Sequence, residues 1–334
     1  MTHRNIPSRI PVIDIGPFDT GDSTARHRIA QEVDRACRHI GFLLIANHSV
    51  QRRLVDDTLG VSMEFFARPM EEKDRARPSD TVVPRGYHAI ASRNLAKTYG
   101  LETPPDLREQ FFIGPLAPGS KRFSNLPQAR IFYAENIWPD YPAGFRTVFE
   151  DCCRAMEDLA ARLMRIFAVA LELPDRYFDD KIDHHFNVFL TSHYPVVDDP
   201  EPGQLRCGEH TDFGSLTILA FNDAPGGLQV RMPDDSWYDV TARPGELVVN
   251  IGDMMARWTN DRWKSTVHRV VNPPQSGAAI APRQSIGYFL HPNFDARVEC
   301  LPSCRDPDHP PKYAPIMAGE HMGEKMLRGV ELSP

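Results

Sequence analysis

The stretch that decides the fold of this chain is GEHTDFG (208–214), which sets an imidazole and a carboxylate two positions apart. In an extended strand, residues i and i+2 point to the same face, so His210 and Asp212 can reach one ion. A second imidazole, His268, lies in the β-rich run STVHRV (265–270). Two histidines and one carboxylate can bind one face of Fe(II) and leave its other positions open. The sequence predicts this triad, although the pattern alone also fits two core histidines.

A second polar pair follows fifteen residues after His268, where Arg283 and Ser285 open a run of alternating character. Because they are again two positions apart, both side chains face the same side of a strand. A guanidinium with a hydroxyl beside it suits a carboxylate, which it binds through two parallel hydrogen bonds. We therefore expect a carboxylate ligand near the metal. The alternative, a surface ion pair of Arg283, would make this spacing accidental.

The second half of the chain is rich in short β-type runs separated by turn residues, such as NDAPGG (222–227) and TARPG (241–245). Many short strands at such spacing suggest a sandwich, a barrel or a jelly roll. The predicted strands are 186–194, 215–221, 227–231, 246–250, 266–271 and 284–290.

The first half reads mainly as helices and loops. Helical spacing predicts a helix over 23–40 that stops at Gly41 and a long helix over 145–173 with a continuous apolar stripe. The remaining predictions are a buried strand at 42–45, a helix at 63–73 kinked or ended by Pro69, loops with short elements over 78–142, and a final helix over 319–329. We expect a mixed α/β fold with a mainly β core, divided into regions 1–175, 176–296 and 297–334.

Composition narrows the class of partner. The 334 residues are 41% hydrophobic and 25% charged, which is ordinary for a globular protein. A formal net charge of −7 argues against nucleic acid or an anionic membrane as the main partner. The six cysteines include no C-x-x-C pair, which favours reduced thiols. The N-terminal residues carry no apolar signal region, so we expect a cytoplasmic protein.

These motifs also carry a resemblance that runs over nearly the whole chain. HTDFG, STVHRV and RQSIGYF resemble the signature of the 2-oxoglutarate and Fe(II)-dependent dioxygenases of the isopenicillin N synthase-like superfamily. Further segments are similar to that superfamily in order and spacing: PVIDIGPF (11–18), ACRHIGFLLIANHSV (36–50), FFARPMEEK (65–73), PRGYHA (84–89), DLREQFFIG (106–114), GGLQV (226–230), PGELVVNIGDMM (244–255) and TNDRWKSTVHRV (259–270).

The resemblance implies a double-stranded β-helix, or jelly roll, with a helical N-terminal region, a long backbone helix and a C-terminal helix. It implies that His210, Asp212 and His268 bind Fe(II) at the open end of the jelly roll. Arg283 and Ser285 would hold the distal carboxylate of 2-oxoglutarate, whose 1-carboxylate and 2-keto oxygen chelate the metal.

The segment before Pro195 departs from the pattern. Tyr194 occupies the tyrosine of the superfamily's N-Y-Y-P segment and would add a hydrogen bond to 2-oxoglutarate. Ser192 stands where many relatives have Asn, His193 where they have Tyr, and Leu190 where they often have Arg. These departures put the secondary contacts to 2-oxoglutarate in question.

The implied reaction uses O2 to oxidise a C–H bond of a small molecule, most simply by hydroxylation, with succinate and CO2 as co-products. The substrate would be an amino-acid-derived or natural-product intermediate. The candidate substrate contacts are Asn187, Phe189, Phe213 and Phe289, with Arg108 and Tyr87 as weaker candidates. Asn250 and Asp253 are expected to orient the ligands. The identity of the substrate and the choice among hydroxylation, desaturation and cyclisation stay open.

Three alternatives remain at this point. An oxidase of the same superfamily, such as isopenicillin N synthase or aminocyclopropane carboxylate oxidase, does without 2-oxoglutarate and also carries an R-x-S pair. A non-catalytic jelly roll that binds small molecules would need neither metal nor O2. A zinc hydrolase could use the same triad but leaves Arg283 and Ser285 unexplained.

Overall fold

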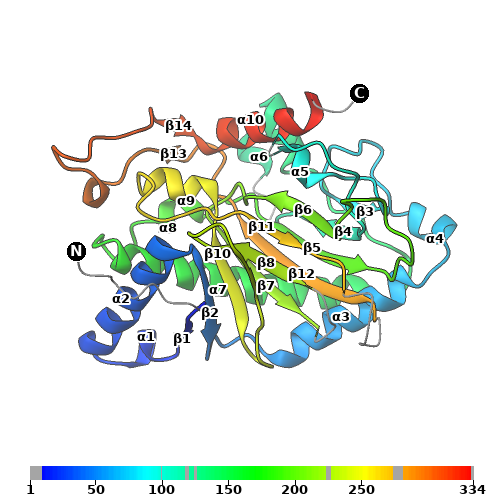
Figure 1. Ribbon diagram of the computed structural model, residues 1–334, viewed down its shortest axis with the longest axis horizontal. Helices are drawn as coiled ribbons and strands as arrows, with labels where there is room; N and C mark the ends of the chain where they lie inside the picture. Colours follow the sequence, from blue (N-terminus) through cyan, green and yellow to red (C-terminus); the bar gives the residue numbers. More distant parts are fainter. Residues whose placement is uncertain are drawn as a thin grey trace.

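The computed structural model describes residues 10–98, 100–116, 120–123, 126–222, 227–273 and 281–331 (Figure 1). Its helices are α1 (Pro17–Thr20), α2 (Ser23–His39), α3 (Arg52–Phe66), α4 (Met70–Asp74), α5 (Leu95–Thr98), α6 (Ser120–Phe123), α7 (Phe145–Ala170), α8 (Asp179–Ile182), α9 (Asp253–Trp258) and α10 (Ala318–Glu331), with 3-10 turns at Pro127–Ile131 and Pro302–Cys304. Its strands are β1 (Val12–Asp14), β2 (Phe42–Ala46), β3 (Gly86–His88), β4 (Glu109–Ile113), β5 (Val188–Tyr194), β6 (Cys207–His210), β7 (Leu216–Phe221), β8 (Leu228–Arg231), β9 (Trp237–Asp239), β10 (Leu247–Ile251), β11 (His268–Val270), β12 (Arg283–Leu290), β13 (Arg297–Val298) and β14 (Ile316–Met317).

Most predicted elements are confirmed within a few residues, including α2, β2, α7, the six predicted strands and α10. The predicted helix over 63–73 is two helices, because α3 ends at Phe66 and Pro69 caps the start of α4. Gly41 does end the first long helix. Its φ of +70° is left-handed, and a Cβ there would collide with the carbonyl oxygen of Lys264, so only glycine fits.

The largest layer is an eight-stranded sheet in the order β1-β2-β10-β7-β12-β5-β4-β3. β1 and β2 pair in parallel, and the other neighbouring pairs of this sheet are antiparallel. Four of its strands, β1 to β4, come from the first half of the chain. The prediction of loops with short elements over 78–142 agrees with the short strands β3 and β4. It did not identify β4 as a strand, because β4 is buried on both faces and shows no alternation of polar and apolar residues.

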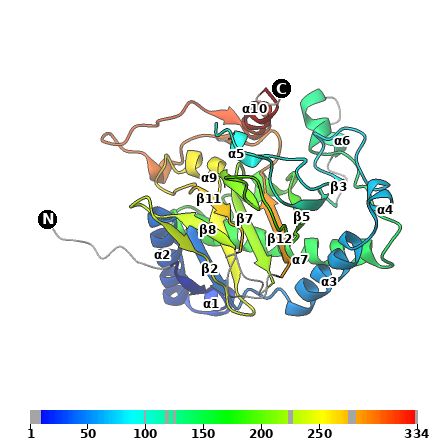
Figure 2. The same cartoon turned by 45° about the vertical axis from the view of Figure 1, so that its right-hand side comes forward.

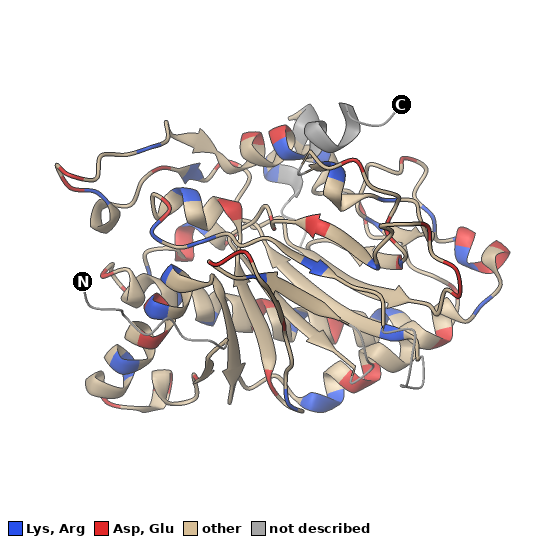
Figure 3. Cartoon of the chain, viewed as in Figure 1, with Lys and Arg blue, Asp and Glu red and all other residues tan. Residues whose placement is uncertain are grey.

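Helix α7 packs on one face of this sheet, with α2 and α3 alongside it (Figure 1). The largest apolar cluster fills this interface, with residues such as Phe149 and Leu163 of α7 against Phe111, Ile286 and Tyr288 of the sheet. The apolar stripe predicted for the long helix is therefore the side that packs on the sheet. Figure 3 shows the charged residues gathered on helices and loops, while the strands are mostly uncharged.

A smaller four-stranded sheet, in the order β6-β11-β8-β9, lies over the other face of the large sheet (Figure 2). A second apolar cluster joins the two sheets through Phe42, Leu44 and Val248 from the large one and Leu228 and Val230 from the small one. The structure thus has a sheet-rich core in which two β layers enclose the region that carries the predicted site. In the described part of the chain, no helix combines the length and the apolarity needed to cross a bilayer.

Candidate functional site

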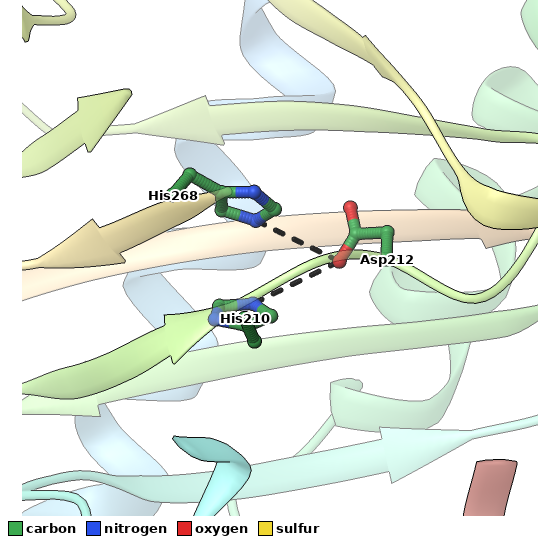
Figure 4. Close-up of side chains that lie close together, drawn as sticks. All are labelled: His210, Asp212 and His268. Carbon is green, nitrogen blue, oxygen red and sulfur yellow. Dashed lines mark ion pairs between the residues drawn. The ribbon is translucent and has the colours of Figure 1, made fainter. Parts of the chain in front are cut away.

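The three predicted metal-binding side chains meet between the two sheets (Figure 4). His210 is the last residue of β6 and His268 the first of β11, and these antiparallel neighbours place the two histidines opposite each other. Asp212 follows β6 in a loop, so the extended-strand argument holds for His210 but not for the carboxylate itself. Asp212 Oδ1 lies 3.8 Å from His210 Nε2 and 3.7 Å from His268 Nε2. One candidate ligand atom from each residue lies within 4.8 Å of the other two.

Backbone carbonyls fix the orientation of both imidazoles. His210 Nδ1 lies 2.8 Å from the carbonyl oxygen of Gly208, and His268 Nδ1 lies 3.0 Å from that of Thr266. Since a carbonyl only accepts, each Nδ1 carries the proton and each Nε2 presents its lone pair toward the shared position. Such outer hydrogen bonds are typical of histidines that bind metals.

Two side chains hold the carboxylate of Asp212 in the same way. The hydroxyl of Thr217 on β7 donates to Asp212 Oδ2 at 2.5 Å, and the amide of Asn250 on β10 donates to the same oxygen at 2.7 Å. Oδ1 is thereby left to face the histidines. The expectation that Asn250 orients a ligand agrees with this geometry. Asp253 acts differently, because its backbone N–H donates to the Asp212 carbonyl while its carboxylate pairs with Lys325.

Burial and neighbouring charges set the protonation of the triad. Burial, together with the charge of His268, lowers the pKa of His210 to about 3, so this imidazole is neutral at pH 7. Burial by itself would raise the pKa of Asp212, but His268, His210 and the two hydrogen bonds lower it, so the carboxylate is ionised. A neutral imidazole and an anionic carboxylate are the forms that bind a divalent metal.

A cavity leads from the triad along the large sheet to Arg283, the first residue of β12. Arg283 pairs in register with Tyr194 on β5, and Ser285 pairs with Ser192. The Ser285 hydroxyl lies 3.4 Å from the Tyr194 hydroxyl, and the guanidinium stacks over the ring of Tyr194. The structure therefore brings Arg283 and Ser285 to one face, as their spacing predicted, and Tyr194 lies beside them.

Arg283 has the chemistry of an anion-binding residue. It is only 3% exposed, its Nη1 has no hydrogen-bond partner, and no carboxylate of the described residues forms an ion pair with it. A buried guanidinium with an unpaired N–H group and no counterion is costly, so the site calls for an anionic ligand. The cavity thus offers three metal-binding atoms at one end and a carboxylate receptor at the other, which fits Fe(II) and 2-oxoglutarate together.

The four predicted substrate residues are not all near this cavity. Phe289 lines it. Asn187 and Phe189 lie on the opposite face of the sheet, where Asn187 contacts Cys153 of α7 at 3.7 Å and Phe189 packs on Phe149. Phe213 is half-buried against the large core and lies outside the cavity lining.

The period of two along β5 explains this outcome. Tyr194 faces the cavity, so the even-numbered residues Leu190 and Ser192 face it too, while odd-numbered residues face α7. The same rule could have found Leu190 from the sequence. Thr217 gave no such signal, because only the fold brings it to Asp212. The rest of the apolar lining comes from Leu219, Phe221, Leu228 and Val270.

The weaker substrate candidates and the residues before Pro195 that depart from the superfamily pattern also lie on two different faces of the sheet. Arg108 lines the cavity, whereas Tyr87 and His193 both bond to Glu109 on the helix side of the sheet. Ser192 accepts a hydrogen bond from Gln110 of β4 at 3.0 Å inside the cavity.

Comparison with known proteins agrees with the site. Residues 185–292 match the 2OG-Fe(II) oxygenase superfamily, and residues 10–141 match the non-haem dioxygenase in morphine synthesis N-terminal family. The chain is similar to the 2-oxoglutarate-Fe(II) type oxidoreductase hxnY of Emericella nidulans, with 33% identity over 97% of this chain and 89% of that protein. It is also 32% identical to the homoarginine-6-hydroxylase 2-ODD-233 of Oryza sativa subsp. japonica, over 95% of this chain and 96% of that one.

A solved structure supports the same assignment. A full-length Neurospora crassa protein, crystallised in complex with alpha-KG and thymine, superposes with a TM-score of 0.81 at 32% identity, covering 95% of this chain and 96% of that one. Because alpha-KG is 2-oxoglutarate, these relatives favour a 2-oxoglutarate-dependent enzyme over an oxidase that does without it. The chain belongs to the 2OG-Fe(II) oxygenase superfamily and is an oxidoreductase that uses Fe(II), 2-oxoglutarate and O2.

Proposed function

We propose that this enzyme hydroxylates a C–H bond of a small molecule, with succinate and CO2 as co-products. The observation that carries the proposal is the cavity itself, which joins the buried triad to a buried guanidinium whose Nη1 lacks an acceptor. When bound, iron and 2-oxoglutarate supply the oxidising chemistry, and the protein supplies position and enclosure.

In this proposal His210, Asp212 and His268 hold the iron through Nε2, Oδ1 and Nε2. The support is that Nδ1 of each histidine forms a hydrogen bond with a backbone carbonyl and that Asp212 Oδ2 accepts two hydrogen bonds. The two Nε2 atoms and Oδ1 are therefore the atoms left to bind the metal. Three protein ligands on one face leave the opposite positions open for cosubstrate and O2.

Arg283 and Ser285 bind the distal carboxylate of 2-oxoglutarate, and Tyr194 adds a hydroxyl to that end. The guanidinium presents parallel N–H donors that match a carboxylate, and in the Ser285–Tyr194 hydroxyl pair the hydroxyl that accepts keeps its own hydrogen to donate to the ligand. The apolar side chains of the lining lower the local polarity, which strengthens these charged interactions. Phe289, Leu190 and Gln110 line the same cavity and replace Asn187 and Phe189 as our proposed substrate contacts.

The two sheets form a jelly roll in this proposal. The chain alternates between the layers from β5 onward: β5, β7, β10 and β12 belong to the large sheet, and β6, β8, β9 and β11 belong to the small one. Such alternation is how a double-stranded β-helix winds. We keep 176–296 as the catalytic core, with 1–175 and 297–334 as supporting regions, and note that β1 to β4 extend the core sheet.

A small-molecule substrate fits a cavity enclosed between two sheets, and the Neurospora crassa relative was solved with thymine bound. A cytoplasmic location is supported by the six cysteines, all free and buried.

The test is a screen for succinate release. Purified enzyme with Fe(II), 2-oxoglutarate and O2 is incubated with a panel of pyrimidine bases, amino acids and their derivatives, and products are read by mass spectrometry. A gain of one oxygen atom in step with succinate supports hydroxylation, whereas loss of two hydrogen atoms indicates desaturation or ring closure instead. Product formation without 2-oxoglutarate would contradict the proposal.

A further inference from the structure

A second guanidinium, that of Arg108, lines the same cavity. Arg283 on β12 lies opposite Tyr194 on β5, and Glu109 on β4 lies opposite His193. Arg108 precedes Glu109, so it continues the register beside Tyr194 on the other side of β5. Arg283 on β12, Tyr194 on β5 and Arg108 just before β4 therefore form one row, and all three line the cavity.

Both guanidiniums of this row are buried and incompletely bonded. The Arg108 side chain is 9% exposed; its Nη2 donates to Asp106 Oδ2 at 2.9 Å, but its Nε has no partner. Arg283 lacks a partner at Nη1. The other oxygen of Asp106 accepts the backbone N–H of Gly208 at 2.9 Å, so this carboxylate is already shared.

The charges of this row do not balance among the described residues. Two buried guanidiniums line the cavity, and Asp106 is the carboxylate that pairs with one of them. Buried cations are tolerated only with counterions, so the row calls for a further anion.

We propose that Arg108 is a second arginine for the distal carboxylate of 2-oxoglutarate, which lies between Arg108 and Arg283 and against the Tyr194 hydroxyl. This inference rests on the proposed function, because it assumes that Arg283 receives that carboxylate. A carboxylate has two oxygens with about four acceptor sites, enough for two guanidiniums and a hydroxyl. Arg108 is then a positioning residue for the cosubstrate, and its ion pair with Asp106 holds the guanidinium in the cavity lining.

Two other roles of Arg108 predict different behaviour. If Arg108 only supports Asp106, which holds the start of β6, its loss affects every ligand of the cavity alike. If it binds a carboxylate of the prime substrate, its loss leaves 2-oxoglutarate binding unaltered. A ligand that lacks the distal carboxylate separates these cases.

The experiment measures binding by calorimetry with the Mn(II)-loaded protein and no prime substrate, so no turnover occurs. The two probes are 2-oxoglutarate and 2-oxopentanoate, which has the same chain length and metal-chelating end but a methyl group in place of the distal carboxylate. The variants are Arg108→Gln, Arg108→Lys and Arg283→Gln. The control is Arg269→Gln, which loses a 3.1 Å ion pair with Glu209 on the outer side of the small sheet.

The expected result is that Arg108→Gln weakens 2-oxoglutarate binding about tenfold or more, which corresponds to about 1.4 kcal/mol, and leaves 2-oxopentanoate binding within about twofold. The affinity of Arg108→Lys for 2-oxoglutarate should lie between that of Arg108→Gln and that of wild type, and the affinity of Arg269→Gln should match wild type. Melting temperatures of the metal-free variants show which are folded.

If Arg108→Gln weakens the binding of both probes equally, the inference is overturned and Arg108 has a structural role. If 2-oxoglutarate binding is unaltered, the inference is also overturned, and Arg108 is assigned to a carboxylate of the prime substrate. Failure of the proposed function looks different: wild type would not bind 2-oxoglutarate, or Arg283→Gln would bind it as wild type does.

Discussion

Replacing Thr217 by Val tests how the metal-binding carboxylate is held. Thr217 is 1% exposed on β7, and its hydroxyl donates to Asp212 Oδ2 at 2.5 Å. Valine has nearly the same shape, so the substitution removes this donor with little change in packing. Asn250 still donates to the same oxygen at 2.7 Å, so the carboxylate keeps one of its two donors.

The expected magnitude follows from the charge on Asp212. A hydrogen bond to a charged group contributes about 1.5–3 kcal/mol, and each 1.4 kcal/mol is a factor of ten in an equilibrium constant. Thr217→Val should therefore weaken metal binding by about ten- to a hundredfold, the range found when outer hydrogen bonds of metal ligands are removed. Titration with Mn(II), followed by electron paramagnetic resonance, measures the affinity without turnover.

Thr217→Val should also change the pH dependence of metal binding. The Thr217 hydrogen bond favours the ionised carboxylate and so lowers the pKa of Asp212, together with the larger effects of His268 and His210. Without that donor the pKa rises. Because metal binding needs the carboxylate ionised, the variant should lose metal at a higher pH than wild type as the solution is acidified.

Thr191→Val is the matched control. Thr191 is fully buried in β5, on the α7 side of the same sheet, and its hydroxyl has no hydrogen-bond partner. The same chemical change there should leave metal affinity unaltered and stability equal or higher. Equal metal affinities in Thr217→Val, Thr191→Val and wild type would refute the claim that the Thr217 hydroxyl holds Asp212.

Three further outcomes are expected. Asp212→Ala should abolish turnover and Mn(II) binding while the circular dichroism spectrum stays that of wild type; wild-type activity would refute the ligand assignment. Arg283→Lys should raise the KM for 2-oxoglutarate strongly, because an ammonium cannot reproduce the two parallel hydrogen bonds, and an unchanged KM would move the carboxylate site elsewhere. Glu109→Gln should lower the free energy of unfolding by about 3 kcal/mol, because it breaks a buried pair with Lys73. Burial raises the Glu109 pKa, but hydrogen bonds from His193, Lys73 and Tyr87 lower it overall, so the wild type loses this stability as pH falls through the folded-state pKa, and the variant should show a flatter acid limb in denaturant titrations.

Much of the fold was predictable because local patterns and tertiary packing agree. Three features could be predicted from the residues alone, because each has a local sequence pattern: the apolar stripe of α7, the end of the first long helix at Gly41 and the alternating run of β12. β4 was predicted only as part of a region of loops with short elements. Both of its faces are buried, one by α7 and the other on the cavity side, and this removes the alternation that marks a strand.

The candidate site was likewise predictable where a local pattern relates its residues. Residues two apart share a face, which predicted that Arg283 and Ser285 would act together and would also have placed Leu190 with Tyr194. The choice of Asn187 and Phe189 was made on the same strand but with the wrong parity, and the structure puts them against α7.

The sequence by itself determined the kind of chemistry: which residue types can bind a metal and a carboxylate, and the spacings that give pairs of them a common face. Only the tertiary structure decided what surrounds those atoms. Thr217, Asn250 and Arg108 come from three different strands or their ends, and no spacing along the chain relates them to Asp212 or Arg283. Strand register and the facing of two sheets bring them there, because side-chain direction is local whereas strand pairing joins segments that lie far apart in the chain.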